Sequence, residues 1–146
     1  MVVVGVSVLL LAKSSEACSC IEVHKTDEQS AADYRAEYGR AVAVFVGRVI
    51  RDDGYEATFE VDQVWKGDLS ERVTVQTGER HAGSITFSSD EYHFVAGMTY
   101  VVFAYGTVSR MKSQCCSPTS ETTTPPSASA LARLRSIATP KPPAGR

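Results

Sequence analysis

Four cysteines, placed as two close pairs at the two ends of a long segment, constrain this chain more than any other feature. Cys18 and Cys20 are separated by one residue, and Cys115 and Cys116 are adjacent. A bond within either pair would close a strained local ring, so we expect two disulfides that join the first pair to the second, in either of two orders. Either one closes a loop of about 100 residues, and closing such a loop contributes about 4–5 kcal/mol in the chain-entropy model. The spacing is not the Cys-x2–4-Cys pattern of structural zinc sites.

The N-terminal residues of the chain indicate secretion, which would bring the protein into the oxidising environment where such disulfides form. Residues 1–12 form an uninterrupted apolar run. This run is shorter than the ~20 residues of a membrane-spanning helix, and its length is typical of a secretory signal. Ser15 and Ala17 provide the small residues that precede a cleavage site. We therefore expect a signal peptide over 1–17, a mature chain that starts at Cys18, and a secreted, extracellular protein.

Two alternatives remain for this segment. One is a buried N-terminal strand or helix that is retained in the folded protein. The other is a lipoprotein signal, in which Cys18 would carry the lipid anchor, although Ser15 and Glu16 fit that signal poorly.

The bulk properties favour one domain that does not bind nucleic acid. The 146 residues are enough for a single domain with a real core, and the formal net charge is -2. No basic cluster stands out, so the electrostatic footprint of a nucleic-acid binder is missing. A stacking surface for bases formed by Trp65 with Tyr55 and Phe59 is a weaker interpretation than a core or barrel-end role for Trp65. We expect a monomer without a membrane span.

The sequence carries no pattern typical of an enzyme. His24, His81 and His93 are scattered, and neither a His-x3-His nor a Gly-x-Ser-x-Gly motif is present. Each histidine is more often a surface residue than a ligand. We therefore expect no catalytic site, no metal site of the chain's own and no cofactor.

Alternating apolar residues and turn signals predict about five strands. Asp52-Asp53-Gly54 is a hairpin turn signal between the first two of them, and the alternation changes phase between Val61 and Val64, which indicates a bulge or bend. A polar loop is expected over 78–90. The predicted strands cover 41–50, 57–65, 71–77, 98–106 and 108–112.

Two short helices are expected on either side of the strands. The first starts at an N-cap at Asp27 and ends at Gly39. The second is capped by Ser127 or Ser129, because Leu131, Leu134 and Ile137 recur at helical spacing after a Ser/Thr/Pro-rich segment.

Together these elements favour a mainly β fold, a small antiparallel barrel of the OB type with flanking short helices. An immunoglobulin-like sandwich is the alternative, but it would place its cysteines within the strands. The domain is expected to span 18–138, with a disordered tail over 139–146.

The order of these motifs resembles the N-terminal, netrin-like domain of the tissue inhibitors of metalloproteinases, over about residues 18–138. Cys-Ser-Cys leads into a strand, then F-x-V-x-x-V-x-K-G, F-x-x-G-x-x-Y-x-V-F-A and a closing Cys-containing segment. The matching stretches are CSC (18–20), AVFVGRV (43–49), FEVDQVWKG (59–67), FVAGMTYVVFA (94–104) and SQCCSPT (113–119).

The resemblance implies a function for the first residues of the mature chain. In the family, the free α-amino group and the carbonyl oxygen of the first cysteine chelate the catalytic zinc of a target metalloendopeptidase. Those groups here belong to Cys18, Ser19 corresponds to the residue whose side chain enters the protease's first primed-side pocket, and Cys20 anchors the strand behind it.

The chain departs from the family pattern at one position. The family's first cysteine pairs with a cysteine that would lie here within GSITF (83–87), which has none. Cys115, which is extra beside Cys116, is the candidate replacement. The alternative function is therefore a netrin-like extracellular binding or matrix module without protease inhibition.

Overall fold

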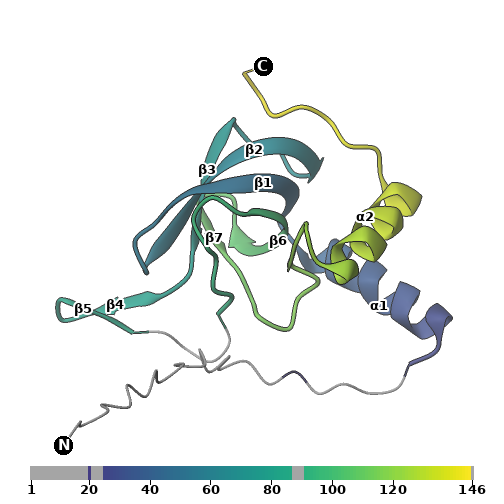
Figure 1. Ribbon diagram of the computed structural model, residues 1–146, viewed down its shortest axis with the longest axis horizontal. Coiled ribbons are helices and arrows are strands. Elements are labelled where there is room, and N and C mark those ends of the chain that lie inside the picture. The colour runs from purple at the N-terminus through teal and green to yellow at the C-terminus, as the bar shows by residue number, and fades with distance from the viewer. Residues whose placement is uncertain (1–19, 21–24, 87–90, 146) are drawn as a thin grey trace, which may run out of the picture.

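The computed structural model describes residues 20, 25–86 and 91–145 of the chain. Among these residues the protein is mainly β, with a barrel flanked by two helices (Figure 1). The elements in chain order are α1 (Asp27–Arg40), β1 (Ala43–Asp52), β2 (Glu56–Lys66), β3 (Arg72–Gln76), β4 (Glu79–His81), β5 (Ser84–Thr86), β6 (Thr99–Thr107), β7 (Arg110–Lys112), β8 (Ser120–Glu121) and α2 (Pro125–Ile137).

The barrel closes because β1 pairs on both of its edges. It lies antiparallel to β2 on one side and to β6 on the other. β2 pairs with β3, and β7 connects β3 to β6, so the order β1–β2–β3–β7–β6 returns to β1. All of these pairings are antiparallel except β3–β7, which is parallel and consists of Gln76 opposite Lys112. The predicted small barrel of the OB type is confirmed.

The nearly continuous apolar sequence of β1 follows from burial on both faces. Phe45 and Val49 point into the barrel, and Val44 lies under the helices on the outside. The predicted irregularity in β2 is also present, because the register of β1 against β2 shifts where Val46 is opposite Gln63 and Gly47 is opposite Val61. A side chain at position 47 would lie 2.9 Å from the carbonyl oxygen of Glu60, so glycine is required there.

Two separate apolar clusters lie on either side of the barrel wall. The barrel interior is the larger one and includes an edge-to-face pair between Phe59 and Phe94, at 4.9 Å between ring centroids. The second cluster lies between the outer face of β1 and β6 and the two helices, so that the helices cover one side of the barrel (Figure 1). Trp65 belongs to this second cluster and is 5% exposed, which agrees with its interpretation as a core residue. The buried members of the second cluster are Tyr34, Ala41, Val44, Trp65, Val101, Phe103, Tyr105, Ala130 and Leu134.

Both helices begin slightly before the residues that the sequence indicated. In α1 the N-cap is Thr26, whose side chain and that of Gln29 form a reciprocal capping box, so the cap precedes the predicted Asp27 by one residue. In α2 the N-cap is Thr124, and Pro125 and Pro126 form the start of the helix. Proline fits the first helical turn because the N–H that it lacks has no partner within the helix there.

The structure corrects the expectation of a disordered tail for residues 139–145. The backbone N–H and carbonyl of Lys141 both bond to Val64 of β2, each at 2.8 Å, and the N–H of Ala144 donates to the carbonyl of Leu69. β3 pairs with β2 only from Glu56 to Glu60, so this later part of β2 has an open edge. The C-terminal segment satisfies the backbone N–H and carbonyl of Val64 on that edge.

The expected loop after β3 contains a small hairpin outside the barrel. β4 and β5 pair with each other through a tight turn at Ala82 and Gly83, which have φ of 46° and 85°. Two positive φ angles are characteristic of the turns that join such short strands. The hairpin projects away from the barrel (Figure 1).

Candidate functional site around the disulfide tether

The structure joins the two ends of the cysteine pattern. Cys20 forms a disulfide with Cys116, with 5.5 Å between their Cα atoms, which is one of the two expected orders. Cys115 is also disulfide-bonded, and no described cysteine is free. Its sulfur lies 3.7 Å from that of Cys116. The residue at position 20 is therefore fixed to the barrel, and it is exposed.

Three of the residues that the sequence singled out lie outside the described residues. These are Cys18, the expected zinc-chelating residue, Ser19, an expected protease-contacting residue, and His24; the expected signal peptide over 1–17 lies outside them as well. The structure therefore describes the anchor of the candidate site, Cys20 with Cys116, and the surface beside it.

The sulfur atoms at the tether do not form a metal site in their bonded state. Cys20, Cys115 and Cys116 bring their sulfurs within 4.8 Å of one another, and within the described residues this is the only group of three possible metal ligands. Metal ligation requires thiolates, and these sulfurs are in disulfides. Their role in this state is to link two segments covalently.

The turn that carries Cys116 is fixed to the barrel by hydroxyl groups. The side chain of Thr119 accepts a 3.0 Å hydrogen bond from the backbone N–H of Phe103 in β6. The hydroxyl of Ser117 donates to the carbonyl of Gln114 at 2.6 Å and lies 2.9 Å from the hydroxyl of Thr119. The chain then enters β8, which pairs with β6. The disulfide is thus attached to an ordered part of the fold.

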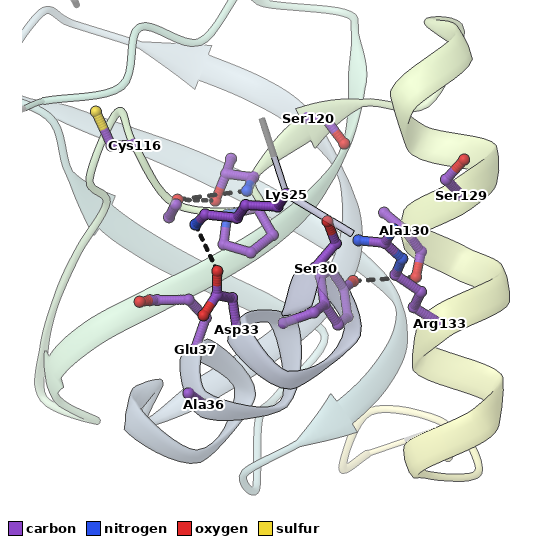
Figure 2. Close-up of a pocket in the computed structure, with 14 residues that line it drawn as sticks. Lys25, Ser30, Asp33, Ala36, Glu37, Cys116, Ser120, Ser129, Ala130 and Arg133 are labelled. Carbon is purple, nitrogen blue, oxygen red and sulfur yellow. Dashed lines mark hydrogen bonds and ion pairs between the residues drawn. The ribbon is translucent and has the colours of Figure 1, made fainter. Parts of the chain in front are cut away.

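A polar groove of about 680 Å³ lies beside this turn, between α1, α2 and the segment from Cys116 to Ser120 (Figure 2). Its floor contains the buried Tyr34, whose hydroxyl donates a 3.0 Å hydrogen bond to the carbonyl of Ala130 and so connects the two helices. The groove is lined by Lys25, Ser30, Asp33, Tyr34, Ala36, Glu37, Cys116, Ser117, Pro118, Thr119, Ser120, Ser129, Ala130 and Arg133.

Most of the charged groups in the groove already have partners within the protein. The ammonium group of Lys25 pairs with the carboxylate of Asp33. Glu37 accepts a hydrogen bond from the hydroxyl of Tyr105 at 2.7 Å and pairs with Arg40 at 2.7 Å. Arg133 reaches from α2 toward α1, and its guanidinium lies 5.7 Å from the ring centroid of Tyr34 (Figure 2).

Two tyrosines around the groove are held in their neutral form. Burial raises the pKa of the Tyr34 phenol well above its ordinary value, against the opposing effect of Arg133. Burial also raises the pKa of Tyr105, and the hydrogen bond to the Glu37 carboxylate adds to this increase. Both groups remain hydrogen-bond donors at neutral pH, because desolvation disfavours the phenolate of each and the Glu37 carboxylate further disfavours that of Tyr105.

These tyrosines predict a loss of stability at alkaline pH. In the unfolded chain a tyrosine ionises near pH ~10, and in the folded protein Tyr34 and Tyr105 ionise at higher pH. Their contribution is therefore complete below pH ~10 and decreases as the pH rises above it. Urea unfolding from pH ~8 to ~12 should show this decrease, and Tyr34→Phe and Tyr105→Phe should each reduce its slope. Ionisation of all tyrosines near pH ~10 in the still-folded protein would contradict the expectation.

The remaining sequence candidates are separate from the groove. His81 lies on the projecting hairpin, 3.1 Å from the carboxylate of Glu79, and is exposed. His93 lies in the segment before β6 and is also exposed. Neither lines the groove. Conversely, Lys25 and Arg133 were not singled out from the sequence, because no local pattern relates a residue before α1 to one on α2.

Comparison with known proteins adds no family assignment. No protein-family model matches the chain, and no curated protein matches it either. Within the described residues, neither helix combines the length and the apolar character needed to cross a membrane.

Proposed function

We propose that the chain is a secreted inhibitor of zinc metalloendopeptidases that itself catalyses no reaction. Its mature N-terminal residue, Cys18, would chelate the protease's catalytic zinc through its amine and carbonyl oxygen. The observation that supports the proposal is the disulfide between the exposed Cys20, two residues further on, and Cys116 on an OB-type barrel. This is the anchor that the resemblance to tissue inhibitors of metalloproteinases requires.

The proposed chemistry is consistent with the properties of a catalytic zinc. Such a zinc has three protein ligands and one position held by water. A neutral α-amine can displace that water and form a five-membered chelate together with the carbonyl oxygen of its own residue. Because the reference pKa of an α-amine is ~7.7–8, its deprotonation at neutral pH reduces the affinity only slightly.

The tether at Cys20 supports the proposal through preorganisation. A free N-terminal segment would lose conformational entropy when it entered an active-site cleft. The disulfide connects this segment to a turn that Ser117 and Thr119 attach to β6. Part of the ordering is therefore complete before the protease binds, and Ser19, the adjacent residue, would contact the first primed-side pocket.

A second candidate, an extracellular binding module without inhibition, is favoured by one specific observation. The projecting hairpin of β4 and β5 has no cysteine, although the resemblance places there the bonding partner of the family's first cysteine. The hairpin is therefore not linked to the N-terminal segment by a disulfide, and the surface that faces a protease would differ from that of the family.

The test is an inhibition assay with two forms of the protein. The first begins at Cys18, and the second carries one added alanine before Cys18, which moves the amine away from the zinc. We expect the first to inhibit a zinc endopeptidase and the second to bind about 100-fold more weakly, a difference of about 2.7 kcal/mol.

An alanine added after Arg146 serves as the matched control and should not change inhibition. Mass spectrometry should find an unmodified Cys18 at the start of the secreted chain. Equal inhibition by both N-terminal forms would rule out chelation, and inhibition by neither would leave the binding-module alternative.

A further inference from the structure

The polar groove beside the disulfide tether has the chemistry of a peptide-binding site. We propose that it binds an extended segment of a partner protein that carries a carboxylate side chain, with Arg133 as the residue that pairs with this carboxylate. If the partner is the inhibited protease, that identity rests on the proposed function. The binding of a carboxylate peptide by the groove is argued independently of it.

Arg133 is the cation of the groove that is available to a ligand. It is half-buried, and among the described residues it has no ion pair with a carboxylate, whereas Lys25 is paired with Asp33. Its contact with the ring of Tyr34 holds the guanidinium over the groove floor. A planar guanidinium presents paired N–H donors that match the two oxygens of a carboxylate, and stacking on an aromatic ring limits its rotational freedom.

The anchor under Arg133 is rigid. Tyr34 belongs to the outer apolar cluster, makes an edge-to-face contact with Phe103 at 5.3 Å and bonds to the backbone of α2. The same α2 carries Arg133, and its Leu134 is fully buried. The cation is therefore positioned by groups that a ligand would not need to move, which reduces the ordering required on binding.

The charges that line the groove favour a peptide with one carboxylate over a polyanion. Two cations, Lys25 and Arg133, are opposed by two carboxylates, Asp33 and Glu37, so the formal charge of the lining is zero. A sulfated or phosphorylated chain would bring additional negative charge close to Asp33 and Glu37. A single carboxylate at Arg133, flanked by uncharged residues, brings only one negative charge and so keeps this repulsion small. The hydroxyls of Ser30 and Ser129 line the same groove and suit the polar groups of a peptide.

The size and position of the groove agree with this occupant. Its volume of about 680 Å³ is in the range of small-ligand sites and accommodates a short stretch of peptide rather than a whole domain. Cys116 forms part of its lining, so the groove adjoins the tether. A protein that binds at Cys20 would therefore lie next to the groove.

The test uses nuclear magnetic resonance titration of the isotope-labelled, disulfide-bonded protein with two end-blocked peptides, Gly-Ser-Glu-Ser-Gly and Gly-Ser-Gln-Ser-Gly. We expect the glutamate peptide to shift the amide signals of residues 116, 117, 119, 120 and 129–133, and the glutamine peptide to bind at least about tenfold more weakly. Arg133→Gln should weaken the glutamate peptide by about the same factor, and Arg133→Lys by less.

Arg135→Gln is the matched control, because Arg135 is on the same helix, is exposed and does not line the groove. Its effect should be negligible. The proposal is overturned if both peptides bind equally, if Arg135→Gln weakens binding as much as Arg133→Gln, or if no shift occurs in the groove up to about 10 mM peptide. It is also overturned if a sulfated oligosaccharide binds there and the glutamate peptide does not.

The two proposals can fail separately. Peptide binding in the groove by a protein that inhibits no zinc endopeptidase would contradict the proposed function alone. Inhibition without peptide binding would contradict the groove proposal alone. If Arg133→Gln does not fold, the comparison of the two peptides on the unaltered protein still decides the result.

Discussion

Reduction of the disulfides with a phosphine is expected to lower the free energy of unfolding by about 4–5 kcal/mol, as the chain-entropy model gives for a loop of this length. The bridge from Cys20 to Cys116 spans 96 residues. Without it, the unfolded chain gains the entropy of a long open segment, whereas the native barrel keeps its hydrogen bonds. Urea unfolding of the oxidised and reduced protein, monitored by circular dichroism, measures the difference.

Removal of this bridge alone is expected to have a much smaller effect. Cys115 remains disulfide-bonded in the variant with Cys20→Ser and Cys116→Ser, and the sequence predicts that its bridge joins the same two segments. The loop would then stay closed, and the loss should be about 1 kcal/mol or less. A loss as large as that of full reduction would mean that the two bridges do not close the same loop.

Phe59→Ala is expected to destabilise the barrel by about 3–5 kcal/mol. The side chain of Phe59 is fully buried and makes edge-to-face contacts with Phe45 at 5.4 Å and Phe94 at 4.9 Å. Its truncation removes both contacts and leaves a cavity between β1, β2 and the segment before β6. Chemical denaturation gives the magnitude.

Two further variants separate packing from other causes. Phe59→Leu keeps much of the volume and should lose about 1.5 kcal/mol, because the aromatic contacts are still lost. Val108→Ala, at a position that is 57% exposed, should change stability by less than about 0.5 kcal/mol. A loss for Phe59→Ala no larger than that for Phe59→Leu would show that the interior repacks around the gap.

The barrel could be predicted from the sequence because each of its strands and turns is indicated by the residues of that same segment. Three such patterns are the alternation in β2, the turn at Asp52–Gly54 and the change of phase after Val61. The turn is confirmed in detail, since Asp53 accepts hydrogen bonds from the backbone N–H groups of Tyr55 and Glu56 at 3.0 and 2.9 Å. These N–H groups, led by that of Glu56, hold the pKa of Asp53 below its ordinary value.

Features that depend on distant partners could not be predicted in this way. Nothing local indicates that Lys141 pairs with Val64, because the reason is the open edge that the short β3 leaves on β2. The turn of the projecting hairpin uses Ala82 before Gly83, and alanine is not a typical residue at positive φ.

In the candidate site, likewise, the disulfide link could be predicted from the sequence and the groove could not. The cysteine spacing predicts that the two pairs are joined, since a bond within either pair is sterically disfavoured. The groove is formed by residues from α1, α2 and the Cys116 turn, and its key cation, Arg133, has no sequence signal of its own. Only the packing of the two helices on β1 and β6 brings these groups together.

The single parallel pairing that closes the barrel, between β3 and β7, is its weakest contact between neighbouring strands. β1 is paired along most of its length to β2 and β6, whereas β3 and β7 are joined only at Gln76 and Lys112. Just beyond this pair, Thr77 and Ser113 are buried, with side-chain hydroxyls that have no hydrogen-bond partner among the residues that the structure describes. Both hydroxyls would gain hydrogen bonds to water if β3 and β7 separated. Transient opening of the barrel would therefore start between these two strands rather than along β1.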